Sequence, residues 1–234
     1  MEVEAWKKAS AKAAAKLVKA GMAVGLGSGT TVAHVVRILA ERKLKAIFIP
    51  SSFATQKLAG ELGLGLGSLE DRPKLDLMID GADEVDPDFN MIKGKGGAQT
   101  REKIVASAAR KVVIVVDRTK LVKRLGERVP VPIEVLSFAY KFTMRKLAEL
   151  GGEARLRTTP AGAPFVTDNG NYIIDVKFAS IPRPAELEVD VNRVPGVVEN
   201  GLFTDMADAV LVGHEGGCTV LRSKRDFLKF THRR

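Results

Sequence analysis

The sequence predicts an α/β fold: a parallel sheet with helices on both faces, joined to a smaller α+β module. Three features lead to this expectation. Short apolar runs alternate with helical patterns over the first half of the chain, and most of these runs end in a glycine-rich or polar turn. The segment 111–116 is almost entirely β-branched, as in strands that are covered on both faces. The pattern changes at Pro130 and Pro132, which marks a boundary.

The individual elements follow from apolar periodicity and from the residues that start and stop helices. An Ala- and Lys-rich segment near the start predicts a helix, and Gly21 stands where its C-cap is expected. Ser51 or Ser52 can cap the helix that follows the second strand. Strands are expected at 22–26, 46–49, 75–79, 111–116 and 209–213, and helices at 6–20, 32–42, 56–62, 99–109 and 137–150. Repeated strand–helix units of this kind form parallel sheets with helical layers.

Two domains are expected. Residues 1–130 and 204–234 form a Rossmann-like domain that carries the candidate site, because the apolar run at 209–213 is typical of a buried parallel strand and returns the chain to the first sheet. Residues 131–203 form the smaller α+β domain, with one helix and several strands separated by turn signals such as Asp-Asn-Gly at 168–170. This smaller domain is a candidate interface between subunits.

Composition excludes several classes of protein. With 234 residues, 45% of them hydrophobic and 28% charged, the chain can bury a core and is not typical of disordered proteins. Its apolar runs are far shorter than a membrane span, and its acidic start lacks the basic and apolar regions of a secretory signal. Cys218 is the single cysteine, so no internal disulfide is possible. We therefore expect a cytoplasmic protein that does not insert into membranes.

The net charge of +9 raises the question of a nucleic-acid partner. Most of the excess is local, because the segment 222–234 carries six Lys or Arg and one Asp, a net charge of +5. Such a run is typical of a solvated terminus, and one Trp and two Tyr offer few platforms for stacked bases. We expect no nucleic-acid partner and favour a small anionic molecule.

The first candidate site is the turn Gly-Leu-Gly-Ser-Gly-Thr-Thr at 25–31. Its glycines let the backbone approach a ligand, and its hydroxyls stand at the start of a helix, where backbone amides favour a phosphate. No Lys precedes the Ser or Thr as a P-loop requires, and Thr30 replaces the third glycine of a dinucleotide fingerprint. A sugar-phosphate cradle is therefore preferred to a nucleotide site. A plain strand-to-helix turn is the alternative.

The second candidate site is Asp-Gly-Ala-Asp-Glu at 80–84, which follows a strand and so lies where the ligand crevices of parallel sheets open. Asp80 and Asp83 suggest acid–base chemistry, although a solvated acidic loop has the same composition. The spacing does not match a calcium-binding loop, and the three histidines lie far apart in the sequence. We expect no metal and no cofactor.

The third candidate site is Ile-Lys-Gly-Lys-Gly-Gly-Ala at 92–98, a glycine-rich turn with two lysines that leads into a helix. Arg101 and Glu102 stand in the first turn of that helix, so a cation, free amides and a carboxylate converge. Lys120 follows another strand of the same sheet and can add a further cation. Plain connecting turns and a solvated lysine are the alternatives, but three such turns in one sheet make coincidence a weaker explanation.

These motifs resemble those of the type A ribose-5-phosphate isomerase family. The resemblance spans nearly the whole chain in order and rests on GLGSGTT at 25–31, PSS at 50–52, DGADE at 80–84, IKGKGGA with TREK at 92–103, and PGVVENGLF at 195–203. It implies a metal-free aldose–ketose isomerase of the non-oxidative pentose phosphate pathway, which acts on ribose 5-phosphate as a homodimer or homotetramer. One departure is Lys95, where many relatives have glycine.

The resemblance also assigns site residues. The substrate-binding positions of the family correspond here to Ser28, Gly29, Thr30, Thr31, Asp80, Gly81, Ala82, Asp83, Lys93, Gly94, Lys95, Gly96, Lys120 and Lys7. Its catalytic positions correspond to Glu102, Asp80, Asp83 and Lys93. Glu102 is the expected base that moves a proton between C2 and C1 of the sugar. Lys93 and nearby amides would offset the negative charge of the enediolate, and either aspartate could open the sugar ring.

Two other functions fit parts of the pattern. A sugar-phosphate-sensing regulatory module would share the sheet and the phosphate turn, but no helix-turn-helix precedes the first expected helix. An NAD-dependent dehydrogenase would need a complete glycine fingerprint and an acid at the end of the second strand. Pro50, Ser51 and Ser52 stand there instead.

Overall fold

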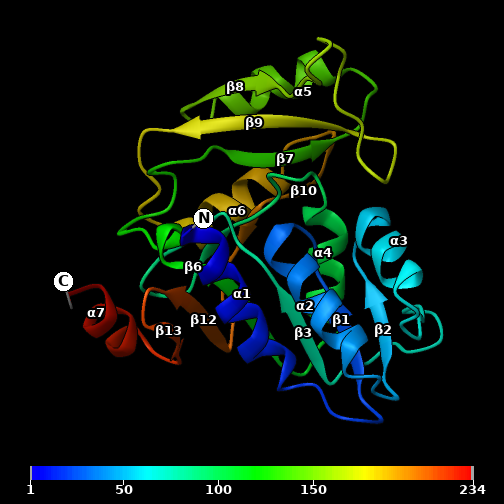
Figure 1. Ribbon diagram of the computed structural model, residues 1–234. Helices are drawn as coiled ribbons and strands as arrows, with labels where there is room; N and C mark the ends of the chain where they lie inside the picture. Colours follow the sequence, from blue (N-terminus) through cyan, green and yellow to red (C-terminus); the bar gives the residue numbers. More distant parts are fainter. Residues whose placement is uncertain (1, 233–234) are drawn as a thin grey trace.

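The computed structural model describes residues 2–232 and is built around a six-stranded sheet with the strand order β13-β12-β6-β3-β1-β2. Its strands are β1 (Ala23–Leu26), β2 (Ile47–Pro50), β3 (Leu77–Asp80), β6 (Val112–Asp117), β12 (Ala209–His214) and β13 (Gly217–Leu221). Neighbouring strands are parallel except for β13, which runs antiparallel to β12 at one edge. The predicted parallel sheet is therefore present (Figure 1).

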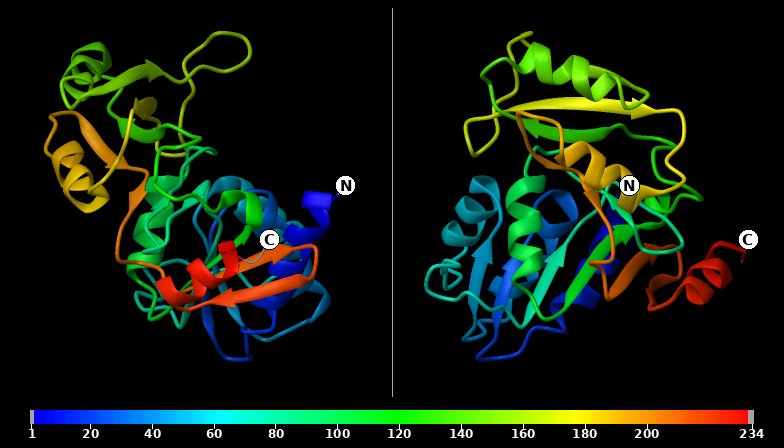
Figure 2. Two further views of the ribbon diagram at one scale, coloured as in Figure 1. Left: turned by 90° about the vertical axis from the view of Figure 1, so that its left-hand side faces the viewer. Right: turned by 180° about the vertical axis from the view of Figure 1, so that it is seen from behind.

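Helices cover both faces of this sheet (Figures 1 and 2). One face carries α1 (Glu2–Ala15), α2 (Thr30–Glu41) and α3 (Phe53–Glu61), and the other carries α4 (Gln99–Ser107) and α7 (Lys224–His232). Strand β6 explains the arrangement, because alternate side chains of a strand point to opposite faces. Val113 and Val115 enter the first core, whereas Val112, Ile114 and Val116 enter the second. The predicted α/β fold with two helical layers is confirmed.

A second, antiparallel sheet stands above the first in Figure 1, with the strand order β10-β7-β9-β8. Its strands are β7 (Val131–Val135), β8 (Gly152–Leu156), β9 (Tyr172–Phe178) and β10 (Val197–Asn200), and α5 (Tyr140–Ala148) and α6 (Pro184–Asn192) pack on it. Three two-residue strands, β4 (Glu84–Val85), β5 (Met91–Ile92) and β11 (Leu202–Phe203), form a small sheet that joins the two parts. The division into two domains stays a prediction.

The first helix differs from its predicted bounds. Helix α1 ends at Ala15 rather than at residue 20, because Leu17 and Val18 form tight backbone hydrogen bonds to residues three positions earlier, which ends the α-helix. Val18 is fully buried in the core that this turn covers. Gly21 has a φ of 84° and lies in the turn that leads into β1, so it is not a helix C-cap.

Two helices were not expected from the sequence. Helix α6 makes the second part an assembly of two helices rather than one. Helix α7 forms in the basic segment after Arg222, where Phe227 enters the core while Lys224 and Lys229 stay outside. The basic side chains in the described part of that segment are exposed, as the sequence predicted, but the segment is helical and buries one apolar side chain.

Pro132 lies inside β7, an interior strand, although the sequence predicted a boundary without a central strand there. Proline has no N–H, so it cannot donate to the carbonyl of Gly201 opposite it. That carbonyl accepts another backbone N–H instead. Gly201 donates its N–H to the carbonyl of Pro132 at 2.7 Å, and its own carbonyl accepts the backbone N–H of Lys93 at 2.9 Å. The missing donor of the proline is thus replaced by one from the glycine-rich segment of the first part.

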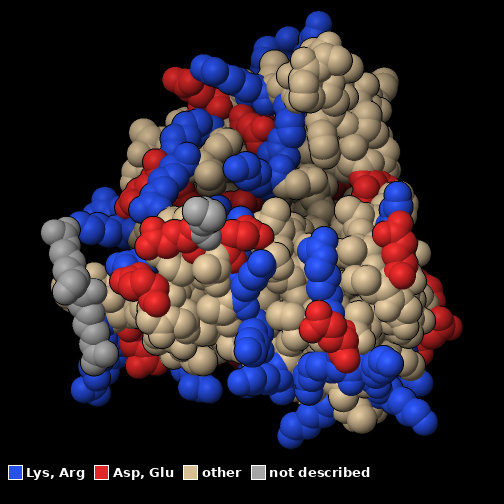
Figure 3. Space-filling model, in the orientation of Figure 1, with Lys and Arg blue, Asp and Glu red and all other residues tan. Residues whose placement is uncertain are grey.

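Charged side chains of both signs lie on the surface of the molecule. On the face drawn in Figure 3, Lys and Arg side chains lie among Asp and Glu side chains over much of the surface, whereas the upper right of the second part carries few charged side chains. Across residues 2–232, no helix has the length and apolar character needed to cross a bilayer.

Candidate active site

The predicted site residues gather at the carboxyl edge of the parallel sheet. Strands β1 and β3 are neighbours there, but the chain leaves them toward opposite sides, since β2 lies beyond β1 and β6 lies beyond β3. Ligand crevices of α/β sheets open at such a reversal of strand order. A cavity of about 390 Å³ lies at this point. It is lined by Lys7, Ser28, Gly29, Thr30, Thr31, Gly81, Ala82, Asp83, Lys93, Gly94, Lys95, Gly96, Glu102 and Lys120.

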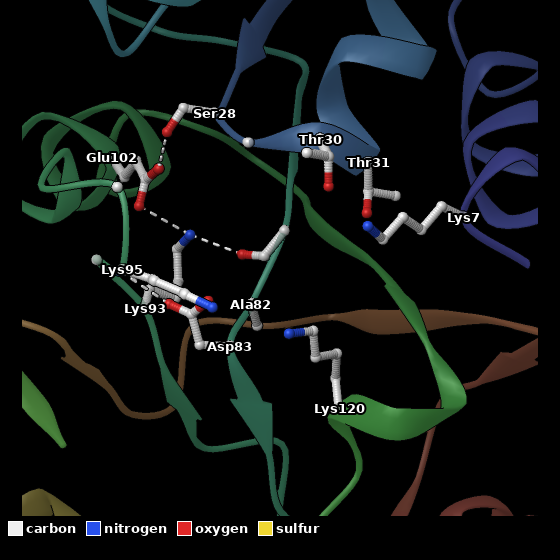
Figure 4. A pocket seen from close by; sticks show the side chains of 14 residues that line it. Lys7, Ser28, Thr30, Thr31, Ala82, Asp83, Lys93, Lys95, Glu102 and Lys120 are labelled. Atoms are coloured by element: carbon white, nitrogen blue, oxygen red, sulfur yellow. Dashed lines mark hydrogen bonds and ion pairs between the residues drawn. The ribbon is translucent and has the colours of Figure 1, made fainter. Parts of the chain in front are cut away.

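Lys93 is the centre of a buried charge cluster at one end of the cavity (Figure 4). Its ammonium nitrogen lies 2.9 Å from an Asp80 carboxylate oxygen and 2.9 Å from a Glu102 carboxylate oxygen, and it donates to the carbonyl of Gly81 at 2.7 Å. These contacts occupy all three donors of a lysine. Lys93 is only 3% exposed, so its orientation is fixed by these partners rather than by solvent.

Glu102 enters the same cluster from the first turn of α4. Lys93 holds one of its carboxylate oxygens, and the hydroxyl of Ser28, in the turn after β1, donates to the other. The side chain is buried and lies at the start of a helix, where the helix dipole favours a negative charge. A carboxylate held in this way can accept a proton without first changing its position.

Asp80 lies behind the cavity rather than on its surface, which differs from the expectation for residues 80–83. One carboxylate oxygen accepts the N–H groups of Gly81 at 2.7 Å and Ser28 at 3.3 Å, and the other meets Lys93. A Cβ at Gly27 would come within 1.7 Å of Asp80 Oδ1, so only glycine allows the first turn to pass this close to β3. Asp80 therefore acts on the site from behind, through Lys93 and the backbone of Gly81 and Ser28.

The cluster shifts the protonation equilibria of its members. Burial, and then the negative charge of Glu102, raise the pKa of Asp80 to about 7. Burial works to lower the pKa of Lys93, but the charges of Asp80 and Glu102 outweigh it and raise that pKa. Lys93 therefore stays cationic at neutral pH, while Asp80 changes charge close to neutrality.

Asp83 and Lys95 stand at the mouth of the cavity (Figure 4). The backbone N–H of Lys95 donates to Asp83 Oδ2 at 2.9 Å, and the Lys95 side chain is exposed. Arg157 supports this turn from the second part, donating to the carbonyls of Gly94 at 2.9 Å and Lys95 at 3.0 Å while it pairs with Asp175. No local pattern in the sequence signals this role, because Arg157 lies some sixty positions from the turn it holds.

The other end of the cavity carries hydroxyls and two lysines. Thr30 and Thr31 begin α2, whose N-cap Gly29 has a φ of 95° and no side-chain cap. In Figure 4 the amine of Lys7, from α1, approaches the hydroxyl of Thr31, and the amine of Lys120 points toward the open space. Lys120 belongs to the short helix η1 (Arg118–Lys120) at the end of β6. Every predicted substrate-binding residue except Asp80 thus lines one cavity.

Within residues 2–232, no group of three or more His, Cys, Asp or Glu is arranged to hold a metal ion. The cation of the cluster is Lys93, which lies between two carboxylates.

Comparisons with known proteins agree on one family. The family model described as ribose 5-phosphate isomerase A (phosphoriboisomerase A) matches residues 47–217. The ribose-5-phosphate isomerase A of Thermosynechococcus vestitus is 51% identical over 217 residues, which cover 90% of this chain and 92% of the relative. That of Pyrococcus abyssi is 42% identical over 227 residues, which cover 94% of this chain and 99% of the relative.

Solved structures show the same likeness. The ribose 5-phosphate isomerase A of Methanocaldococcus jannaschii superimposes with a TM-score of 0.89 at 46% identity and covers 93% of this chain and 98% of its own. A D-ribose-5-phosphate isomerase in complex with phospho-erythronic acid has a TM-score of 0.92 at 41% identity and covers 95% of this chain and 100% of its own. With sequence, fold and full-length coverage in agreement, this chain belongs to the ribose 5-phosphate isomerase A family.

Proposed function

We propose that this protein interconverts D-ribose 5-phosphate and D-ribulose 5-phosphate through an enediolate. One observation carries the proposal: the buried Lys93–Glu102 pair opens onto the same cavity as the hydroxyls of Thr30 and Thr31 and the amine of Lys7. The site thus offers a proton-transfer end and an anion-binding end, as a phosphorylated sugar requires. The names of the relatives and the phospho-erythronic acid bound by one of them support this substrate class.

The anion-binding end suits the phosphate. The start of α2 offers backbone amides without a side-chain cap, and Thr30 and Thr31 add hydroxyl donors. Lys7 and Lys120 add positive charge at the same end of the cavity. A phosphate bound there fixes the distance from the anchor to C1 and C2, so its contribution is orientation of the sugar chain at the carboxylate.

The proton-transfer end suits the isomerisation. In the open-chain aldose, Glu102 takes the proton from C2 while the C2 electrons form a C1–C2 double bond and negative charge moves to the C1 oxygen. The proton on O2 passes to the negative O1, and Glu102 then delivers its proton to C1 as the electrons on O2 form the C2 carbonyl. Lys93 lies beside Glu102 and places a fixed positive charge where the enediolate develops.

Of the two aspartates, Asp83 is the better candidate for opening the sugar ring. Its carboxylate lines the cavity, whereas Asp80 is 1% exposed and lies behind Lys93. Asp83 can exchange a proton with the anomeric hydroxyl or the ring oxygen of a bound furanose. Asp80 serves instead to hold Lys93 and, by changing charge near neutrality, to adjust the net charge next to Glu102.

The direct experiment is an isomerisation assay with ribose 5-phosphate, with ribose and arabinose 5-phosphate as comparisons. We expect ribose 5-phosphate to be converted with a far higher kcat/KM than ribose, which lacks the anchor, and than arabinose 5-phosphate, which differs at C2. Equal rates for ribose and ribose 5-phosphate would remove the role of the hydroxyl-rich end. Absence of conversion of all three sugars would reject the proposed function.

We also propose that the protein is a cytoplasmic homodimer or homotetramer that associates through its second part. Large apolar side chains are exposed on that part, with Phe138 the most exposed at 85% and Leu136, Phe142 and Val198 less so. Such patches are typical of surfaces that associate. Light scattering coupled to size-exclusion chromatography tests this state, and a monomer at micromolar concentration would contradict it.

A further inference from the structure

Glu134 is a fully buried carboxylate that does not line the cavity. It lies on β7, an interior strand of the second sheet, where its backbone pairs with Ile173 of β9 and Glu199 of β10. A buried carboxylate is costly unless it is hydrogen-bonded. The position of Glu134 is therefore determined both by two flanking strands and by the donors that surround its side chain.

Those donors come from two separate elements. Thr167, Asn169 and Asn171, all in the turn before β9, donate to Glu134 at 2.8, 3.1 and 2.8 Å. Thr100, in the first turn of α4, donates its hydroxyl to the other carboxylate oxygen at 2.5 Å. The carboxylate thus joins the second sheet to the start of the helix that carries the proposed base.

A second connection runs alongside the first. Arg101, the next residue of α4, donates to the side-chain oxygen of Asn169 at 2.7 Å and to the carbonyl of Asp168 at 2.8 Å. Asn169 in turn donates to Glu134. Thr100 therefore contacts Glu134 directly, and Arg101 contacts it through Asn169. Two consecutive residues at the start of α4 are held by the same carboxylate.

The geometry of a helix relates these contacts to Glu102. Residues two positions apart on an α-helix project about 200° from one another, so Thr100 and Glu102 lie on nearly opposite faces of α4. Glu134 holds one face through Thr100, and Lys93 and Ser28 hold the other through Glu102. Rotation or sliding of the first turn would break both sets of contacts together.

We propose that Glu134, acting through the Thr100 hydroxyl, is a positioning residue for the proposed base Glu102. This inference rests on the proposed function, because it concerns the orientation of Glu102 for proton transfer. The second sheet then contributes to catalysis by fixing the angle at which α4 presents its carboxylate. Displacement of a catalytic group by about 1 Å can reduce the rate by as much as about a hundredfold.

The test removes the hydroxyl and then restores it. Thr100→Val keeps the shape of the side chain and deletes the donor, and we expect kcat to fall by about tenfold or more while KM for ribose 5-phosphate changes by less than about twofold. Thr100→Ser returns the hydroxyl and is expected to restore most of kcat. If Thr100→Val does not fold, Thr100→Ala removes the same group without the branched side chain.

Thr143→Val is the matched control. Thr143 is another buried threonine, on α5, and its hydroxyl donates to the carbonyl of Pro195 at 3.1 Å, away from α4. We expect a comparable loss of thermal stability with unchanged kcat. A folded Thr100→Val with the kcat of the wild type, or an equal fall of kcat in Thr143→Val, would overturn the positioning role. Wild-type protein is assayed in parallel, and its inactivity would instead contradict the proposed function.

Discussion

The ammonium of Lys93 lies 2.9 Å from a carboxylate oxygen of Glu102, and both side chains are at most 5% exposed. Because neither group can be reoriented by solvent, the proposed base and the charge that would stabilise its product stay at a fixed separation before any substrate binds. The same lysine also touches Asp80. The site therefore holds one cation between two carboxylates, and the net charge of the three groups depends on whether Asp80 is protonated.

The first prediction concerns the pH dependence of stability. Because the pKa of Asp80 is raised from 3.8 to about 7 in the folded state, the folded protein binds more protons than the unfolded chain between these values. The stabilising contribution of protonated Asp80 is thus fully present below the lower pKa and is lost as pH rises through the upper one. The free energy of unfolding of the wild type, minus that of Asp80→Asn, should fall by at most about 1.4 kcal/mol per pH unit in this window.

Urea denaturation of both proteins between about pH 5 and pH 8 measures this difference. Asp190→Asn, on the exposed side of α6, is the control and should track the wild type. A difference that stays constant or grows with pH would show that Asp80 is ionised throughout the range.

The second prediction concerns the phosphate end. Thr31→Val should raise KM for ribose 5-phosphate with little change in kcat, because the phosphate is bound alike in the ground state and the transition state. The loss should be about 1 to 3 kcal/mol, as for a hydrogen bond to a charged group. Thr31→Ser keeps the hydroxyl and should behave like the wild type. If the valine variant is folded and its KM is unchanged, the turn is a plain connection.

The third prediction concerns Lys95, at the mouth of the cavity. The exposed amine at the cavity mouth should attract the anionic substrate over several ångströms. Lys95→Gly and Lys95→Met should both lower kcat/KM at low ionic strength, and the difference from the wild type should shrink at about 0.5 M salt. Lys45→Met is the control, because Lys45 is exposed and precedes β2 at the amino ends of the parallel strands, whereas the cavity lies at their carboxyl ends. A difference that salt leaves unchanged would point to packing rather than charge.

The fourth prediction concerns metals. Activity should survive exhaustive treatment with a chelator, because Lys93 and backbone amides can stabilise the enediolate and no metal-binding cluster was found among residues 2–232. The assay compares treated and untreated enzyme at equal concentration. Loss of activity that is restored by a divalent metal ion would contradict the metal-free mechanism.

Much of the fold and site was predictable because the signals are local. The alternation of strands and helices, the three glycine-rich or acidic turns and the carboxyl-edge location all follow from runs of a few residues. Ser52 caps α3 by accepting the N–H of Thr55, as its position before a helical pattern predicted. Lys93 and Glu102 stand in adjoining turns of the sequence, and the structure brings them into direct contact.

What could not be predicted depends on contacts between distant segments. Arg157 and Glu134 reach the catalytic segment from the second sheet, and no nearby motif marks either residue. Helix α7 was not predicted, because basic residues dominate its sequence. Few apolar positions in it, Phe227 among them, indicate a buried face. The depth of Asp80 is likewise a tertiary property, set by how closely Gly27 passes over it.

The central claim is that Glu102 transfers the proton, and Glu102→Gln tests it most directly. The amide keeps the shape of the carboxylate but cannot accept a proton from C2. We expect kcat to fall by roughly 10² to 10⁴ with little change in KM, and the far-UV circular dichroism to match the wild type. Glu61→Gln, on the exposed end of α3, is the matched control and should remain fully active.

Exchange of solvent deuterium into ribose 5-phosphate decides between Glu102 and the competing candidate, Asp83. Exchange and turnover report the same proton transfer, so both should fall together in Glu102→Gln. In Asp83→Asn, exchange into sugar that is already open should persist. Persistence of exchange in Glu102→Gln, together with its loss in Asp83→Asn, would contradict the account and identify Asp83 as the base.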